Sequence, residues 1–195
     1  LNKFIYYTKK SKYFIEKLEV HGPGEPTLWK NFNEGIKILH KSNVIGKIIV
    51  TSNGKSLDRI HNETWNYIDY INVSCYPDVE LNFKKYKSMI NILEQGEFKR
   101  IPQRRYENTI PCQCACYGPM FLKDKIFFYC GPPVFDAANL MGVNINKDTD
   151  LFVPLELNYL DKFKKENIGN LKYCEYCWAN MNIITGLEEH TQKIN

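Results

Sequence analysis

The sequence predicts an α/β protein in which a parallel sheet is followed by a smaller, irregular domain rich in cysteine. In the first half, apolar runs of strand length alternate with segments of helical periodicity at intervals of about 25 to 30 residues, which is the rhythm of βαβ crossovers. In the second half, prolines interrupt the chain, and every cysteine except Cys75 lies there. We therefore expect a first domain over residues 1–98 and a second over 99–195.

The elements of the first domain follow from where apolar residues recur. Leu18 and Val20 alternate with polar residues, as in a strand with one buried face, whereas the run around Ile48 is almost continuously apolar, as in a sheet covered on both faces. Thr27 is a suitable N-cap, and Gly96 a suitable end, for the flanking helices. The predicted strands are 14–21, 46–52 and 70–76. The predicted helices are 27–41, 56–68 and 79–95.

The second domain has too little periodic apolar character to fill a core of its own. A hairpin is predicted over 121–130, turning at Lys123-Asp-Lys125, and helical spacing extends over 155–166. A small domain of this kind needs an additional source of stability, and bound metal is the expected one.

Cysteine spacing indicates where that metal binds. The segments Cys112-Gln-Cys-Ala-Cys116 and Cys174-Glu-Tyr-Cys177 have the C-x-C and C-x-x-C spacing of metal sites, and the cytosol keeps such thiols reduced. In an extended run the side chains of alternate residues share a face, so Cys112 and Cys114 are alternative first ligands. The predicted ligands are Cys116, Cys130, Cys174 and Cys177. Four thiolates suit zinc and an iron–sulfur cluster alike.

Charge and hydropathy narrow the possible partners. The net charge is +4 and dispersed, and the one dense basic patch, 99–105, adjoins a proline and is typical of a solvated linker rather than a nucleic-acid surface. No apolar run approaches the roughly 20 residues of a membrane-spanning helix. Residues 1–7 are too few for the core of a signal peptide. We expect a cytoplasmic protein that binds neither nucleic acid nor membrane.

Three short stretches close the predicted strands: His21-Gly-Pro-Gly-Glu-Pro-Thr27, Thr51-Ser-Asn-Gly54 and Ile71-Asn-Val-Ser-Cys-Tyr-Pro77. Because the carboxyl ends of parallel strands meet at one edge, we expect these stretches to form a ligand site. Gly22 and Gly24 let a ligand approach the backbone closely, and the exposed carbonyls with the Glu25 carboxylate accept hydrogen bonds from an ammonium group. The alternative is an ordinary strand-to-helix turn with Glu25 near a helix N-terminus.

In order and spacing, these stretches resemble the middle of a radical S-adenosylmethionine (SAM) enzyme. In that family a Gly-Gly-Glu-Pro stretch holds the amino group of the cofactor's methionine, and here Pro23 takes the place of one glycine. A Thr-Asn-Gly turn ends the next strand, with Ser52 as an inserted or replaced residue here, and a hydroxyl on the third strand meets the ribose. The resemblance implies cofactor contacts for Gly22, Gly24, Glu25, Pro26, Thr51, Asn53 and Ser74. It assigns no catalytic residue.

The cysteines resemble the auxiliary-cluster region, called SPASM or twitch, that follows the barrel in many radical SAM maturases. The position five residues before the second cysteine, usually glycine, is Lys125 here, and no further cysteine follows Cys177. A single-cluster, twitch-like arrangement therefore fits best. The implied cofactor is an auxiliary 4Fe-4S cluster, with zinc as the alternative.

The same resemblance implies a partial parallel (β/α) barrel over 1–98 and an auxiliary-cluster domain over 99–195. The C-x-x-x-C-x-x-C loop of the family's catalytic 4Fe-4S cluster does not occur in these residues, so that cluster and the first barrel strand are expected upstream of Leu1. In the family, the reduced cluster cleaves SAM to a 5′-deoxyadenosyl radical that abstracts a substrate hydrogen. The implied substrate is a peptide or protein, and the implied electron donor a flavodoxin or ferredoxin. The alternatives are a noncatalytic zinc-binding interaction module and a degenerate radical SAM relative.

Overall fold

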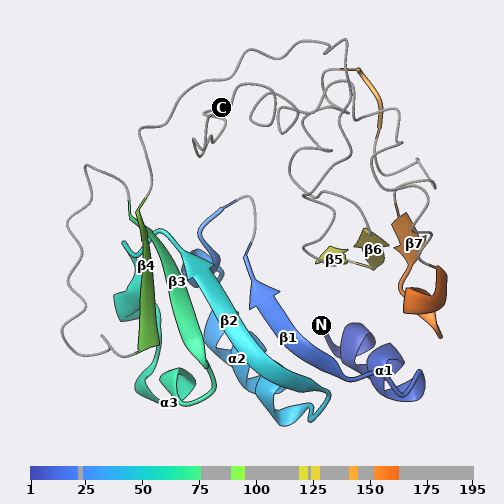
Figure 1. Ribbon diagram of the computed structural model, residues 1–195, viewed down its shortest axis with the longest axis horizontal. Helices are drawn as coiled ribbons and strands as arrows, with labels where there is room; N and C mark the ends of the chain where they lie inside the picture. The colour runs from blue at the N-terminus through green and yellow to red at the C-terminus, as the bar shows by residue number, and fades with distance from the viewer. Residues whose placement is uncertain are drawn as a thin grey trace. The chain divides into compact units, whose positions relative to one another are not determined.

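The computed structural model describes residues 1–21, 24–75, 89–94, 119–122, 124–127, 141–144 and 152–162. The chain divides into two compact units, Leu1–Glu97 and Phe98–Asn195 (Figure 1). The division lies next to the change in composition that separates the two expected domains.

The first unit contains a four-stranded parallel sheet whose strands lie side by side in chain order (Figure 1). The predicted α/β class and the parallel sheet are confirmed, and each of the three predicted strands is present. The strands are β1 (Ile15–Val20), β2 (Ile45–Ser52), β3 (Tyr70–Cys75) and β4 (Ile90–Glu94).

The core of this unit runs across the sheet along matched positions of neighbouring strands. Val50 lies beside Val20 of β1 and beside Ile71 of β3, and Ile71 lies beside Ile90 of β4. Val50 and Ile71 are completely buried, as is Val73 two residues further along β3. Burial of branched apolar side chains at this spacing is what a pleated parallel sheet requires, and it positions the strand ends that follow.

Two of the described helices, α2 (Phe32–Lys41) and α3 (Asn62–Trp65), lie between strands in the chain and contact each other. The unit begins with α1 (Asn2–Lys10), in which Phe4 and Thr8 are buried one turn apart. After β1 come the 3-10 turn η1 (Pro26–Leu28) and α2, which packs on β2; the 3-10 turn η2 (Leu57–Arg59) and α3 follow β2 (Figure 1). Within the described ranges, no helix combines the length and apolar character needed to cross a membrane.

The predicted helix over 27–41 is wrong in its first part. Trp29 takes an extended backbone conformation (φ −64°, ψ 123°), so the chain forms the 3-10 turn η1 and starts the α-helix only at Phe32. The Trp29 ring lies directly over Gly35, which has no side chain to displace it. The extended backbone at Trp29 therefore interrupts a segment whose apolar spacing alone favours one continuous helix.

The predicted helix over 56–68 is likewise interrupted, at Ile60 and His61, which are both extended. The Asn33 side chain of α2 accepts a hydrogen bond from the His61 backbone N–H at 2.9 Å and donates one to the Arg59 carbonyl at 3.1 Å. These bonds hold the connection in a non-helical form, because the backbone groups that they use are the ones a helix would need.

The predicted helix over 79–95 is wrong over 90–94, where the chain forms β4. Ile90 and Ile92 lie beside Ile71 and Val73 of β3. β-branched residues pack well on a pleated surface, and the backbone hydrogen bonds to β3 outweigh the helical spacing of the segment. Residues 76–88 lie outside the described residues.

The second unit contains a three-stranded antiparallel sheet: β5 (Met120–Leu122), β6 (Lys125–Phe127) and β7 (Phe152–Pro154). The predicted hairpin is confirmed where it is described, since Leu122 pairs with Lys125 across the turn. Helical structure within 155–162 is limited to the 3-10 turn η6 (Tyr159–Lys162), because Asn158 adopts a left-handed conformation (φ 55°) that stops an α-helix. Ile126, Phe127, Leu155 and Tyr159 are buried.

Candidate functional site

A single carboxylate joins two of the three stretches that close the strands. Glu25 follows β1 and is half-buried. Its Oε1 atom accepts a hydrogen bond from the Thr27 backbone N–H at 3.1 Å and another from the Thr27 hydroxyl at 2.7 Å. Glu25 is thus the N-cap of η1, which explains why the chain turns sharply at Pro26, the first residue of that turn.

The same carboxylate reaches across to the end of β2. The Ser52 hydroxyl donates to Glu25 Oε1 at 2.8 Å, and the Asn53 backbone N–H donates to Glu25 Oε2 at 2.7 Å. Thr27 and Ser52 are each only 3% exposed. We call Glu25, Thr27, Ser52 and Asn53 the strand-end clamp, because together they fasten the turn after β1 to the turn after β2.

The clamp leaves its carboxylate well supplied with donors. An ionised carboxylate offers about four lone-pair sites, and four protein donors point at Glu25. Hydrogen bonds to a charged acceptor are the stronger kind, so the clamp gives the two turns a fixed relation to each other.

Hydrogen bonds between its own residues also stabilise the turn after β2. The Ser52 hydroxyl accepts a hydrogen bond from the Gly54 backbone N–H at 3.0 Å, and the Asn53 side-chain oxygen accepts one from the Lys55 backbone N–H at 2.9 Å. Gly54 has a positive φ of 79°, which favours glycine. The predicted contact residue Asn53 therefore uses its carboxamide oxygen to shape this turn.

Gly24 is the member of the first stretch with open space beside it. It is exposed, and a Cβ added to it would meet no atom within 4 Å. Gly22, which the sequence pairs with it, lies outside the described residues. The backbone at Gly24 is therefore accessible to a ligand at the carboxyl edge of the sheet.

Thr51 and Ser74, the other two predicted contact residues, are not in the clamp. Because alternate residues of a strand point to opposite faces, Thr51 faces away from Ser52, and the register places Asn72, Asn91 and Ser74 on the face of Thr51. The Thr51 hydroxyl donates to Glu19 Oε1 at 2.6 Å, and the Asn91 amide donates to the Asn72 side-chain oxygen at 3.3 Å. We call these residues the polar row: Glu19, Thr51, Asn72, Ser74 and Asn91.

The polar row is unusual for a parallel sheet, whose strands are commonly apolar on both faces. Glu19 and Asn91 are exposed, and Thr51, Asn72 and Ser74 are half-buried. Three of its members, Glu19, Asn72 and Asn91, were not among the cofactor contacts predicted from the sequence. The available signal is a polar residue at every second position near the end of an otherwise apolar strand.

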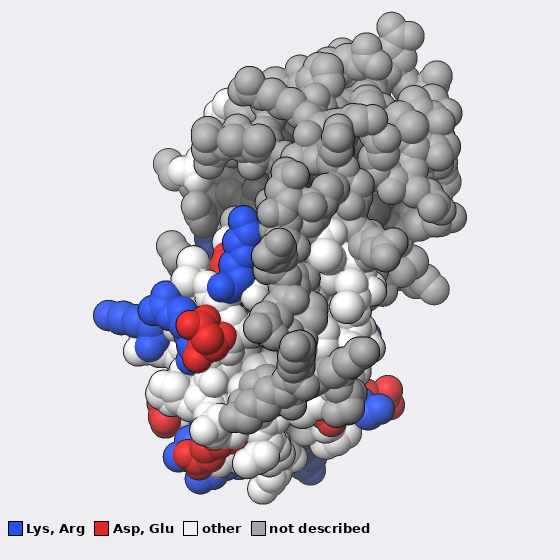
Figure 2. Space-filling model, turned by 90° about the vertical axis from the view of Figure 1, so that its left-hand side faces the viewer, with Lys and Arg blue, Asp and Glu red and all other residues white. Residues whose placement is uncertain are grey.

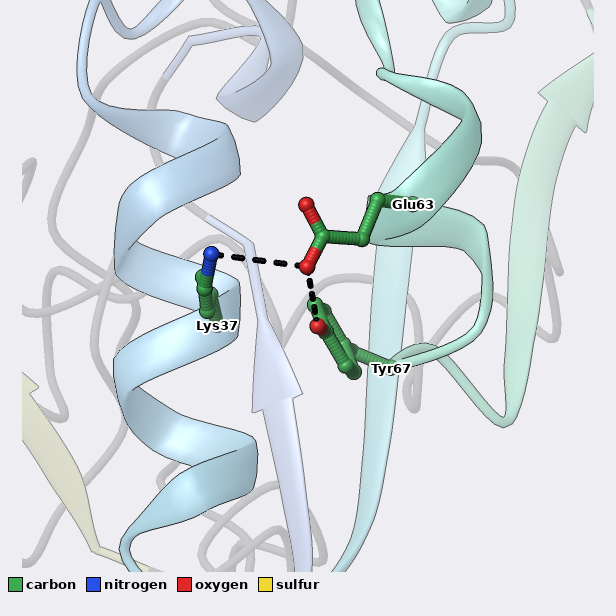
Figure 3. Close-up of polar contacts among 3 residues, drawn as sticks. All are labelled: Lys37, Glu63 and Tyr67. Atoms are coloured by element: carbon green, nitrogen blue, oxygen red, sulfur yellow. Dashed lines mark hydrogen bonds and ion pairs between the residues drawn. The ribbon is translucent and has the colours of Figure 1, made fainter.

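Away from the strand ends, Glu63 forms a surface cluster that ties α2 to α3 (Figure 3). Its Oε1 atom accepts the Tyr67 hydroxyl at 2.5 Å and lies 3.4 Å from the Lys37 ammonium. The hydrogen bond from Tyr67, and then the one from Lys37, lower the pKa of Glu63. The hydrogen bond to Glu63 is also the main reason that the pKa values of Lys37 and Tyr67 are raised. This cluster is a link between helices and contains no feature of a ligand site.

Charged side chains are interspersed on the surface. Figure 2 shows basic and acidic residues mixed over the visible face of the described part of the chain.

The predicted metal ligands Cys116, Cys130, Cys174 and Cys177, with the alternatives Cys112 and Cys114, all lie outside the described residues. Cys75 is described; it is half-buried at the carboxyl end of β3. Among the residues that the structure describes, no group of three or more His, Cys, Asp or Glu side chains is arranged to hold a metal ion. The metal site of the second unit stays a prediction from cysteine spacing.

Comparison with other proteins gives no match from which a function could be assigned. No protein-family model matches the chain, and no curated protein matches it. The chemistry of the site therefore has to be argued from the strand-end clamp, the open backbone at Gly24 and the polar row.

Proposed function

We propose that the first unit binds S-adenosylmethionine at the carboxyl edge of its sheet, as part of a radical SAM enzyme. The observation that carries this proposal is the clamp, in which Glu25 joins the Gly-x-Gly-Glu-Pro stretch to the Ser-Asn-Gly turn. Two stretches that resemble the family separately are thus in contact at the edge where parallel sheets and barrels bind ligands. Parallel strands that lie side by side in chain order also suit the partial (β/α) barrel that this proposal requires.

The available groups fit the cofactor. An α-amino group needs oxygen acceptors, which the accessible backbone at Gly24 supplies, and the absence of a side chain there leaves room for it. A ribose needs hydroxyl or amide partners, which Ser74 and the other residues of the polar row supply. These residues lie on the opposite face of the sheet from the clamp. The protein's part in such chemistry is binding and orientation.

The remaining cofactors of the proposal are iron–sulfur clusters. Cys116, Cys130, Cys174 and Cys177 would hold an auxiliary 4Fe-4S cluster, and the proposal also requires a catalytic one, whose C-x-x-x-C-x-x-C loop does not occur in these residues. In the family, the catalytic cluster supplies the electron that cleaves SAM, and a flavodoxin or ferredoxin reduces it. We propose this enzyme as a cytoplasmic protein.

A peptide is the substrate that best suits the polar row. Asn72 and Asn91 each carry both a donor and an acceptor, and Glu19 carries an acceptor beside them on the same face. Peptide groups present the complementary pattern of N–H donors and carbonyl acceptors. A partly exposed row of this composition, next to the proposed cofactor, suits an extended peptide segment or protein loop.

Calorimetric titration of the full chain with SAM tests the proposal, with Gly24→Val as the informative variant. A Cβ at Gly24 would meet no atom within 4 Å, so the variant should unfold at about the same urea concentration as the wild type. It should nevertheless lose SAM affinity, because the new side chain occupies the space assigned to the ligand. Undetectable binding by the wild type, or unchanged affinity in the variant, would contradict the proposal.

Metal analysis after anaerobic purification separates the second unit's two candidate metals. Brown protein with iron and acid-labile sulfide supports the auxiliary cluster. Colourless protein with stoichiometric zinc supports the other candidate, a noncatalytic zinc-binding interaction module, which the four-thiolate spacing equally suits.

A further inference from the structure

We infer that Glu25 is a positioning residue that does not bind the cofactor itself. It fixes the backbone of Gly24 relative to the turn after β2, and so sets the acceptors for the cofactor's amino group. This inference rests on the proposed function and refines it, because the resemblance alone counts Glu25 among the contact residues.

The first argument is the occupancy of the carboxylate. Both oxygens of Glu25 already accept hydrogen bonds from protein donors, three at Oε1 and one at Oε2. Three of these four donors belong to Thr27 and Ser52, which are buried, so removing the carboxylate would leave those donors without their acceptor. A side chain held in this way determines the orientation of its own backbone and of the peptide bond that joins it to Gly24.

The second argument is the position of Ser52. Its buried hydroxyl donates to Glu25 and accepts from the Gly54 backbone N–H, so it links the two turns through one atom. Ser52 is also the extra residue between Thr51 and the Asn-Gly pair. Its contribution to the cofactor site is therefore indirect, and it should depend on Glu25.

These arguments predict a ligand-specific effect. A misplaced Gly24 carbonyl weakens binding of the part of SAM that carries the amino group, whereas the nucleoside part is unaffected. The nucleoside 5′-methylthioadenosine lacks that amino-acid part and therefore serves as the control ligand. General loss of structure would weaken both ligands alike.

The experiment measures the dissociation constants of both ligands for the full chain and for Glu25→Gln and Ser52→Ala. Ser42→Ala is the matched control, since Ser42 is a buried serine at the end of α2 that donates to the Leu39 carbonyl at 2.6 Å. We expect the SAM dissociation constant to rise about tenfold in both clamp variants, as loss of one such hydrogen bond would give. The constant for 5′-methylthioadenosine should stay within about twofold, and Ser42→Ala should change neither ligand's affinity.

Two results would overturn the inference. If Glu25→Gln alone weakens SAM binding and Ser52→Ala does not, Glu25 acts by direct contact. If both variants weaken both ligands equally, the clamp is merely structural.

If the proposed function is wrong, the wild-type protein should bind neither ligand. That result would also refute the part of the inference that concerns the cofactor. Urea unfolding of the two single variants and the double variant tests the clamp without any ligand. A double variant that loses less stability than the sum of the single losses supports the coupling of Glu25 with Ser52, and additive losses refute it.

Discussion

Thr51 and Ser52 are neighbours in β2, yet their hydroxyls bind two different carboxylates on opposite faces of the sheet. Thr51 donates to Glu19 at 2.6 Å, and Ser52 donates to Glu25 at 2.8 Å. The carboxyl end of β2 is thus fastened on one face to the strand beside it and on the other to the loop that follows that strand. The end of β2 therefore contributes Ser52 and Asn53 to the strand-end clamp on one face and Thr51 to the polar row on the other.

Substitutions at two glycines should have opposite effects on stability. A Cβ at Gly46 would lie 2.8 Å from the Glu16 carbonyl oxygen, which belongs to the paired strand and cannot move away cheaply. Gly46→Ala should therefore lower the free energy of unfolding by about 1 to 3 kcal/mol. A Cβ at Gly35 would instead meet the outer edge of the Trp29 ring at 2.6 Å, and that ring is 50% exposed and free to swing outward.

Gly35→Ala should thus keep part of the gain of about 1 kcal/mol that alanine brings to a helix interior, while tryptophan emission shifts to longer wavelength as Trp29 enters water. In a Trp29→Ala background the same substitution should give the full gain. Urea denaturation checks both values. Equal losses at Gly35 and Gly46 would show that the Trp29 ring is held more firmly than its exposure implies.

Burial should separate two isoleucines on adjacent strands. Ile71 of β3 is completely buried, so Ile71→Ala should cost about 2 to 5 kcal/mol of unfolding free energy. Ile92 of β4 is 54% exposed, so Ile92→Ala should change it by less than about 1 kcal/mol. Urea titrations followed by circular dichroism measure both, and a large loss at Ile92 would contradict the register of β4.

Acid should weaken the link between α2 and α3. The folded-state pKa of Glu63 lies below its ordinary value of 4.5, so the link is fully present above that pH and is lost as pH falls through the lowered pKa. Relative to Glu63→Gln, the wild type should lose stability as the pH falls below about 4.5. The effect should be small, because these side chains are exposed. Denaturation midpoints across this range provide the comparison.

The hydrogen bonds from Tyr67 and from Lys37 both lower the Glu63 pKa, so Tyr67→Phe and Lys37→Met should each return it toward its ordinary value. Carboxyl resonances in an NMR titration report this pKa directly. An unchanged Glu63 pKa in either variant would show that the substituted side chain does not cause the shift.

Cysteine substitution should separate the metal site from the parallel sheet. Replacing Cys174 and Cys177 by serine should release the metal and expose the second unit to protease, because metal binding in a small domain is part of its folding energy. Cys75→Ser is the control and should retain the metal, since Cys75 belongs to β3. Metal retained by the double variant, with unchanged proteolysis, would refute the ligand assignment.

The strands were predictable because their signal is local. The apolar side chains around Ile48 and Ile71 are buried whichever segments surround them. Composition and periodicity are therefore enough to predict these strands. Helix boundaries were less predictable because they depend on distant partners: the Trp29 ring on Gly35, and Asn33 on the loop at His61. β4 was mistaken for helix because its spacing suits both structures until β3 lies beside it.

The site was predictable in its location and only partly in its roles. Topology places the strand ends together, so Glu25 and Asn53 could be expected at one edge. The hydrogen-bond partners of each side chain could not be predicted, because the hydrogen bond from Ser52 to Glu25 joins residues from separate βα units. Sequence patterns mark residues of a suitable type, whereas hydrogen-bond partners depend on the packing of the whole unit.

The chain-ordered sheet also has a consequence for handling the protein. Among the described strands, this order places β4 at the outside of the sheet, and Ile92 and Leu93 of that strand are substantially exposed. An outermost strand with apolar side chains presents main-chain groups that recruit a matching strand from another molecule. A truncated version ending after β4 should therefore aggregate through this edge strand, and charged substitutions at Ile92 or Leu93 should keep it monomeric.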